Sequence, residues 1–419
     1  MEGRPTGWTR RGTLGLLPAL GLAACATRGT TAAEPLRLWA MSWEGDYSPL
    51  LMPAFTAATG IEVEVQSLPT TASHEKLLIA TAGGALPDAF MLFNGWVPEF
   101  ATIGAIAPVP SPAIVADVFP GILAATRVGA RDYAVPWSVA PQVNFYRRDL
   151  LATVGYDAPP DDWQGLRTMA LKLKRRRPDD YVFLMLLNWP TALVNILSQA
   201  GVQPLRDRDT RANFSTPEGR EAFAWYASLF ADGLAPKALS TEVQDPVAAF
   251  AQGYFAIWPS GPTTLRDLAQ RNVPRDRWDT AICAGPRGPA RLSGLSASLC
   301  VSATTPRQAE AWALVRHLTS SPSELHFQRA IGNLPANAAA WGSPQMKQPV
   351  LDAFARQMRL PAVDPKVIEW EQIQLQIQFA AERMVRGVET LPEALAGLDV
   401  RVDRILAKRR ALVDAGKLA

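Results

Sequence analysis

The chain has 419 residues, of which 48% are hydrophobic and 19% are charged, a composition typical of a folded globular protein. Its 42 basic and 39 acidic residues leave a formal net charge of +3. This near balance gives no electrostatic footprint for nucleic acid. The one basic run, residues 172–177, follows a segment with helical apolar periodicity. Because cations are favourable at a helix C-terminus, we interpret the run as a solvated helix end.

The N-terminal segment predicts export. Arg10 and Arg11 precede residues 13–24, a mostly apolar run of about a dozen residues, the length of a signal-peptide core. A bilayer span needs about 20 residues. Residues 9–14 also resemble a twin-arginine motif, although Thr13 replaces the usual bulky apolar residue. Both the general secretory route and the twin-arginine route therefore stay open.

Cys25 follows Leu22, Ala23 and Ala24, and this order resembles the lipobox at which bacterial lipoproteins are cleaved and lipidated. We expect residues 1–24 to be removed as a signal peptide, Cys25 to carry the acyl chains, and residues 25–35 to form a tether. The alternative is an ordinary cleaved signal. The protein is then exported, either periplasmic or held by its lipid alone on the outer face of the bacterial cytoplasmic membrane.

The chain after residue 35 alternates strand-like and helix-like segments. The predicted elements, in order, are a strand at 36–40, a helix at 49–59, a strand at 61–65, a helix at 74–81 and a strand at 88–93. Gly60 is the predicted stop of the first helix and Ser73 the predicted cap of the second. This rhythm indicates an α/β fold with a parallel sheet covered by helices. The 395 mature residues are too many for one core and suit two lobes.

Four later helices are predicted from a hydroxyl placed three residues before Glu or Gln, with a proline near the first turn, the pattern of a capping box. The four starts are Ser215-Thr-Pro-Glu218, Thr305-Pro-Arg-Gln308, Ser321-Pro-Ser-Glu324 and Thr390-Leu-Pro-Glu393. They make the C-terminal two-thirds largely helical.

Apart from Cys25, the chain has two cysteines, Cys283 and Cys300. Both lie on short strand-like runs separated by a Gly/Pro-rich turn. In an oxidising compartment they could form a disulfide across a hairpin, and otherwise they are two buried thiols. Both alternatives stay open at this point.

An ordered set of segments resembles the family 1 extracellular solute-binding proteins, the sugar-binding lipoproteins and periplasmic proteins that supply ABC importers. The likeness covers nearly all of the chain from Leu36 to Leu406. It is carried by FTAATGIEVEV, EKLLIATAGGALPD, DYAVPW, NFYRRDLLATVGYDAPPDDW, NFSTPEGREAFAWYASLF, DPVAAFAQGYFAIWPSG, EAWALVRHLTSSPSELHFQ and GNLPAN.

This resemblance implies a two-lobe periplasmic-binding-protein fold of the class II type, with interlobe hinge strands and a ligand cleft that closes. By analogy the chain crosses near 135–139, near 282–286 and after 335. Lobe one would comprise 36–136 and 287–336, and lobe two 137–286 and 337–419. The implied partners are a sugar and the permease subunits of an ABC importer with their ATPase. We expect a monomer with no cofactor, no metal and no bound nucleic acid.

Tryptophan carries the physical argument for a sugar site, because a sugar presents a face of C–H groups and an edge of hydroxyls. Of the 13 tryptophans, we assign Trp39, Trp163, Trp225 and Trp312 to the core. Six others lie at element ends or beside Gly and Pro, and we expect about half of them to contact ligand. These six are Trp43, Trp96, Trp137, Trp189, Trp258 and Trp370.

Polar candidates stand beside these tryptophans. Glu44 and Asp46 follow the first strand and Asn94 follows the third, and ligands of open α/β sheets sit beyond the carboxyl ends of strands. The resemblance adds Asn188, next to Trp189, and Gly261, whose loop carries Thr263 where the family often has an aromatic residue.

We predict a binding protein and not an enzyme. The chain has no GxSxG, GxxxxGK[ST] or HExxH motif, and its three histidines lack metal-ligand spacing. A secreted glycoside hydrolase, with Glu44 paired to Asp88 or Asp245, is a lesser alternative. The same fold could also bind a polyamine, a phosphorylated compound or another small solute. The candidate loops mix one or two acids with tryptophan and asparagine, which suits a neutral sugar best. The sequence specifies neither the sugar nor whether transport or sensing is the endpoint.

Overall fold

The computed structural model describes residues 34–292 and 295–418. The signal peptide, Cys25 and nearly all of the tether lie outside the described residues. None of the helices in the described ranges is both long enough and apolar enough to cross a bilayer.

A six-stranded mixed sheet contains the predicted N-terminal strands. Its order is β15-β6-β14-β3-β1-β2. Strand β1 pairs in parallel with β2 and β3, as the sequence predicts, whereas β14 runs antiparallel to both β3 and β6. The strands span Leu36–Met41 (β1), Val63–Leu68 (β2), Ala89–Phe93 (β3), Val135–Ala140 (β6), Leu295–Val301 (β14) and Leu334–Pro335 (β15). The second strand therefore lies two to three residues later than predicted.

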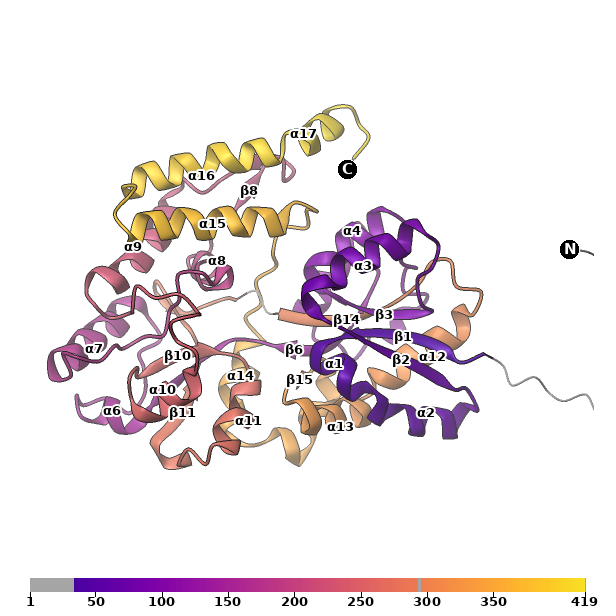
Figure 1. Ribbon diagram of the computed structural model, residues 1–419, viewed down its shortest axis with the longest axis horizontal. Coiled ribbons are helices and arrows are strands. Elements are labelled where there is room, and N and C mark those ends of the chain that lie inside the picture. The colour runs from indigo at the N-terminus through magenta and orange to yellow at the C-terminus, as the bar shows by residue number, and fades with distance from the viewer. Residues whose placement is uncertain (1–33, 293–294, 419) are drawn as a thin grey trace, which may run out of the picture. The chain divides into compact units, whose positions relative to one another are not determined.

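Helices cover this sheet, and in Figure 1 α3 and α4 lie above its strands while α2, α12 and α13 lie below. One buried apolar cluster joins the strands to these helices and includes Leu38, Phe90, Leu299 and Trp312. The helices span Ser42–Tyr47 (α1), Met52–Thr59 (α2), Thr70–Ala82 (α3), Val97–Thr102 (α4), Gln308–Leu318 (α12) and Ser321–Ile331 (α13).

The two predicted boundary residues have different outcomes. Gly60 ends α2 in the left-handed conformation, with φ of 73°, which confirms the predicted stop. Ser73 does not cap α3, because the helix begins one turn earlier, at Thr70, and the Ser73 hydroxyl donates to the Pro69 carbonyl. A serine inside a helix can satisfy its hydroxyl on a carbonyl of the preceding turn, which the sequence pattern does not distinguish from a cap.

A second, three-stranded antiparallel sheet has the order β10-β7-β11 and a core of its own. Its strands span Val143–Arg147 (β7), Ile257–Ser260 (β10) and Trp278–Ala281 (β11). The core cluster includes Leu166, Leu197, Phe223, Ile373 and Leu398, which come from the five long helices around it. These helices span Trp163–Arg176 (α7), Pro190–Gln199 (α8), Pro217–Ala231 (α9), Trp370–Val385 (α15) and Leu391–Ile405 (α16).

Shorter elements connect these parts. The remaining helices are Pro120–Leu123 (α5), Arg148–Ala152 (α6), Pro246–Gln252 (α10), Thr263–Gln270 (α11), Asp352–Gln357 (α14) and Ala407–Asp414 (α17). Two-residue strands pair as β4 (Arg127–Val128) with β5 (Arg131–Asp132), β8 (Leu205–Arg206) with β9 (Arg211–Ala212), and β12 (Ala284–Gly285) with β13 (Gly288–Pro289). A third apolar cluster joins residues of β6, β7, β15 and α14.

Of the four predicted capping boxes, only the one at α16 forms: Thr390 N donates to Glu393 at 2.8 Å. Thr216, one residue after the predicted Ser215, caps α9 by accepting from Gly219 N. The Thr305 hydroxyl donates to Asp88. Glu324, which ends the third predicted box, accepts a hydrogen bond from Asn337 N, 13 residues later. All four helices exist near the predicted starts, but residues from other segments take two of the expected caps and the neighbouring Thr216 replaces a third.

The predicted core tryptophans lie where expected. Trp163 and Trp312 are buried, and Trp39 and Trp225 are half-buried against the same cores. Trp225 stacks on Trp163 with ring centroids 5.1 Å apart. The basic run also ends a helix, since Lys174, Arg175 and Arg176 form the last turn of α7.

The disulfide alternative is wrong, because Cys283 and Cys300 are both free, buried thiols. Cys300 lies in β14, in the core of the six-stranded sheet, whereas Cys283 packs with Ala290 and Leu292 in a separate small cluster. The two runs join different sheets instead of forming one hairpin.

Candidate ligand site

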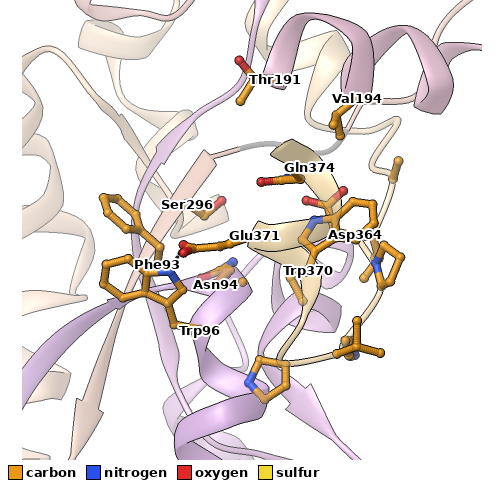
Figure 2. A pocket seen from close by; sticks show the side chains of 18 of the residues that line it. Phe93, Asn94, Trp96, Thr191, Val194, Ser296, Asp364, Trp370, Glu371 and Gln374 are labelled. Atoms are coloured by element: carbon orange, nitrogen blue, oxygen red, sulfur yellow. Dashed lines mark hydrogen bonds between the residues drawn. The ribbon is translucent and has the colours of Figure 1, made fainter. Parts of the chain in front are cut away.

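The pocket that contains the most predicted site residues, named the main pocket here, lies where the loop after β3 faces α8 and α15 (Figure 2). Its volume is about 200 Å³. One wall comes from α3, the short turn Asn94–Trp96 and α4, and the opposite wall from α8, residues 362–368 and α15. The side chains that line it include His74, Asn94, Trp96, Glu99, Gln142, Thr191, Asn195, Ser296, Asp364, Lys366, Trp370, Glu371 and Gln374.

Trp96 connects the two walls. Its Nε1–H donates to Glu371 Oε1 on α15, and Figure 2 shows the two side chains pointing toward one another. On its own wall, the indole packs against the His74 ring, with ring centroids 4.7 Å apart. It also meets the Phe93 ring edge-on, with centroids 5.0 Å apart. His74 in turn contacts Glu99, with 2.7 Å between Nε2 and Oε2. Trp96 is therefore held in one orientation by neighbours from three elements.

Asn94 is also fixed in place. It is buried, and its Oδ1 accepts from the Ser298 hydroxyl of β14 at 2.5 Å. This bond anchors the turn after β3 to the centre of the six-stranded sheet. A polar amide is thereby presented to the pocket at the carboxyl end of a strand, as the sequence predicts.

Residues 362–368 are tied down by a lysine. Lys366 Nζ donates to the carbonyl oxygens of Ala124 and Arg127, each at 2.7 Å. Burial, together with the neighbouring Arg127 charge, lowers the pKa of Lys366. The Lys366 ammonium donates to these two backbone carbonyls and thereby fixes residues 362–368 against residues 124–127.

Trp370 occupies the first turn of α15 and contacts both the pocket and the core. Within the described residues, its buried Nε1–H has no hydrogen-bond partner. A buried indole N–H usually finds an acceptor. Within the described residues the Trp370 indole N–H is thus an unsatisfied donor, as are those of Trp137, Trp258 and Trp278.

Two smaller cavities adjoin the main pocket. A side chamber of about 50 Å³ shares Gln142, Thr191 and Asn195 with it and includes Trp189 in its lining. Another cavity of about 50 Å³ shares Asn94, Ala125, Ser296 and Ala362. Asn188, beside Trp189, instead forms two hydrogen bonds with Ser240, each of 2.8 Å. Its Nδ2 donates to Ser240 Oγ, and its Oδ1 accepts from Ser240 N.

The predicted loop after β1 is helix α1, and none of its three candidates lines the main pocket. Trp43 is 44% exposed. The Arg266 guanidinium carbon lies 4.2 Å from the centroid of its ring, and the Tyr47 ring stacks on it with centroids 5.9 Å apart. Asp46 accepts from the Ser67 hydroxyl. These contacts join α1 to neighbouring elements.

Glu44, the third candidate in α1, is buried and accepts from Ser138 Oγ and Asn333 Nδ2, each at 2.8 Å. Burial raises the pKa of Glu44, and the two hydrogen bonds oppose that rise only in part. Its observed contacts connect α1 to β6 and to the residues just before β15.

The remaining predicted residues also lie outside the main pocket. Trp137 is buried and stacks on Phe327, with centroids 4.6 Å apart and ring planes 8° apart. Trp258 is buried among Phe145, Phe250 and Phe255. Gly261 approaches the Ala140 side chain. The main pocket thus brings together Asn94, Trp96 and Trp370, with Trp189 in the side chamber.

Sequence reasoning missed several residues of the main pocket. Gln374 follows Trp370 by four positions on α15, so helical spacing from this tryptophan candidate could have found it. Glu371 follows Trp370 directly, and helical spacing from Trp370 does not indicate it. Gln142 and Ser296 lie beside strand ends and have no local signal. In the described part of the chain, no group of three or more His, Cys, Asp or Glu side chains could hold a metal ion.

Comparisons with known proteins agree with this architecture. Residues 43–324 match the family described as bacterial extracellular solute-binding protein. The sugar-binding protein MalE from Xanthomonas citri is 34% identical, with 91% of this chain and 99% of that one covered at a TM-score of 0.88.

More distant relatives show the same relationship. Putative binding proteins from Brucella are 23% identical over 95% of this chain and 99% of their own length. The diacetylchitobiose binding protein of Streptomyces coelicolor is 22% identical over 82% of each chain. The chain belongs to the bacterial extracellular solute-binding protein family and has the two-lobe α/β fold of its periplasmic members.

Proposed function

We propose that the protein captures a carbohydrate, a mono- or oligosaccharide, in the main pocket and delivers it to the permease of an ABC importer. The observation that carries this proposal is the placement of two indoles, Trp96 and Trp370, among amide, hydroxyl and carboxylate groups from both walls. Aromatic faces suit the C–H face of a sugar, and the polar groups suit its hydroxyls.

The size of the pocket supports a small sugar. At about 10–15 Å³ for each water-sized group, a volume of about 200 Å³ holds about 13 to 20 such groups. A hexose with its hydroxyls has this size. The MalE relative is named as sugar-binding, and a relative from Pseudomonas aeruginosa, 28% identical over 43% of this chain, is named as mannitol-binding.

We propose binding without turnover. Of the carboxylates considered for a glycosidase pair, Glu44 is buried in hydrogen bonds to Ser138 and Asn333, and Asp88 accepts from Arg37 N and Thr305. Asp245 caps α10 through Ala248 N and pairs with Arg271. Each carboxylate is engaged in structural contacts away from the main pocket, and the named relatives are binding proteins.

We propose that lobe one comprises 36–136 and 287–336 and lobe two 137–286 and 337–419. The core clusters support this division with small differences at the boundaries: one joins Leu36–Trp137 to Ala297–Ile331, and another joins Tyr146–Ala284 to Val367–Leu406. We further propose that Cys25 carries a lipid anchor that holds a monomeric receptor near its permease. The lipobox-like residues before Cys25 support the anchor.

A thermal-shift screen of the chain from Ala26 onward tests the proposal. A ligand that binds only the native state raises the melting temperature by mass action. We expect a shift with at least one mono-, di- or oligosaccharide and none with polyamines, phosphate esters or divalent metals. Trp96→Ala should abolish the shift, whereas Trp39→Phe, on the half-buried face of β1, should retain it. A shift confined to polyamines or phosphate esters, or consumption of a glycoside, would overturn the proposal.

A further inference from the structure

The side chamber is a small apolar cavity that opens beside the main pocket. Its walls include Leu166, Phe183, Met185 and Ile196, and none of the described residues that line it carries a charge. The sulfur of Cys283 lies at this cavity, 3.8 Å from the Gln142 carbonyl oxygen, and burial raises the pKa of the thiol to about 12. The chamber is therefore neutral as well as apolar.

A pair of side-chain amides stands where the chamber meets the main pocket. Asn195 Nδ2 donates to Gln142 Oε1 at 2.5 Å, and both residues line both cavities. Thr191 adds a hydroxyl at the same boundary. The boundary thus offers amide donors and acceptors. The lining beyond it is mostly apolar, with Asn144 and Gln199 as its other side-chain amides and the Cys283 sulfur beside Asn144 Oδ1.

Amide groups at the boundary and a mostly apolar interior beyond them match one substituent of a sugar, the acetamido group. An acetamido group has an amide that can exchange hydrogen bonds with Gln142 and Asn195, followed by a methyl group that favours an apolar cavity. At about 10–15 Å³ for each water-sized group, about 50 Å³ accommodates about three to five such groups. This is the size of an acetyl unit with its amide nitrogen.

We infer that the side chamber receives the acetamido group of an N-acetylated sugar whose ring occupies the main pocket. The inference rests on the proposed carbohydrate function and specifies its substrate class. A hydroxyl in the same position would leave the apolar part of the chamber unfilled, and an ammonium group would bring an unpaired charge into a cavity lined by uncharged side chains. The chamber therefore selects against both the parent sugar and the free amino sugar.

Matched ligands test this by isothermal titration calorimetry with the chain from Ala26 onward. The probes are N-acetylglucosamine, glucose, glucosamine and methyl glucoside, with diacetylchitobiose and cellobiose as the disaccharide pair. A buried methyl group contributes about fourfold in affinity, and the amide contacts raise the difference to about tenfold. We expect each acetylated sugar to bind about tenfold more tightly than its parent, and glucosamine to bind most weakly of the monosaccharides.

Two variants show whether the preference arises in the chamber. Ala192→Val adds two methyl groups to the lining and should remove the preference while leaving parent-sugar affinity within about twofold. Cys283→Ala enlarges the cavity and should favour an N-propionyl sugar over the N-acetyl one. Ala170→Val, in the same core but outside both cavities, is the matched control for overpacking.

The outcomes separate the two hypotheses. If none of these sugars and none of the wider saccharide screen binds, the proposed function fails. If parent sugars bind as tightly as their acetylated forms, the carbohydrate function stands and the chamber inference is overturned. A preference that survives unchanged in both Ala192→Val and Cys283→Ala also overturns it, because the selectivity then originates elsewhere.

Discussion

The guanidinium of Arg266 lies 4.2 Å from the ring centroid of Trp43, so a cation–π contact joins α11 to α1. Arg266 Nη1 also donates to the Ile331 carbonyl at the end of α13, at 3.2 Å. Three elements far apart in the sequence therefore meet at one arginine. Trp43, the tryptophan after the first strand, does not line the main pocket, and its ring packs against Arg266 and Tyr47.

Removing this contact should lower the free energy of unfolding. We expect Arg266→Ala to cost about 0.5–1 kcal/mol, because a cation–π pair at a partly exposed site contributes that much. Arg291→Ala, at an exposed position, is the control. Urea denaturation followed by tryptophan fluorescence measures the difference. A loss no larger than that of the control would show that the Trp43–Arg266 stack contributes nothing.

The buried carboxyl of Glu44 should make stability depend on pH. Burial raises its pKa above the ordinary value of 4.5 in the folded protein, so below that value the carboxyl is protonated in both states and costs nothing. As the pH rises through the folded-state pKa, ionisation in the buried site destabilises the native state. Glu44→Gln keeps an acceptor for Ser138 and Asn333 and removes this titration.

We therefore expect the free energy of unfolding of Glu44→Gln, minus that of the natural protein, to increase as the pH rises above 4.5, because only the natural protein is destabilised by ionisation of a buried carboxyl. Its amide can also donate to Asn333 Oδ1, which is buried without a partner among the described residues. Asp46→Asn removes one charge from the exposed face of α1 and serves as the control. A difference that stays constant with pH would contradict the assignment.

Glu371 should support the ligand site through Trp96. Glu371→Ala leaves the Trp96 indole N–H without its acceptor, whereas Glu371→Gln retains a neutral one. A hydrogen bond to a charged group contributes about 1.5–3 kcal/mol, so we expect sugar affinity to fall about tenfold or more in the alanine variant and less in the glutamine variant. Calorimetric titration measures both. Equal affinity in all three proteins would exclude a role for this bond.

The capping box of α16 provides a local test of stability. Thr390→Ala should lower the free energy of unfolding by about 1 kcal/mol, because the side-chain cap of the first turn is lost. Thr390→Ser keeps the hydroxyl and should restore most of the loss. Parallel urea titrations of the two variants decide the matter; similar losses would assign the effect to packing of the threonine methyl group.

The two cysteines should behave as buried thiols. In the chain from Ala26 onward, a reducing agent should leave the melting temperature unchanged, since Cys283 and Cys300 are unbonded. Iodoacetamide should modify both residues in urea and neither in the native state, because burial raises both thiol pKa values and blocks access. Mass spectrometry counts the adducts; a two-dalton change on reduction would reveal a disulfide instead.

The order of elements around the N-terminal sheet could be predicted from the sequence because it depends on local patterns. These patterns include the alternation of strand and helix segments and the helix stop at Gly60, and each acts within a few residues. The basic end of α7, in the second core, is local in the same way. Asn94 and Trp96, which line the main pocket, were predicted as site residues for a related reason: they follow a buried strand, and ligands of such folds sit beyond the carboxyl ends of strands.

Contacts between distant segments could not be predicted in this way. An exposed loop tryptophan and a buried one look alike in sequence, yet Trp137 is covered by Phe327, 190 positions later, and Trp43 by Arg266. Whether an aromatic ring faces a ligand depends on what else reaches that ring. Local propensity and apolar periodicity encode most of the elements and their order, and the ordered set of short motifs indicates the family. The identity of the tryptophans that border the main pocket, the burial of particular carboxylates and the uncharged chamber beside the pocket follow from the folded structure alone. Each of these depends on side chains that long-range packing brings together.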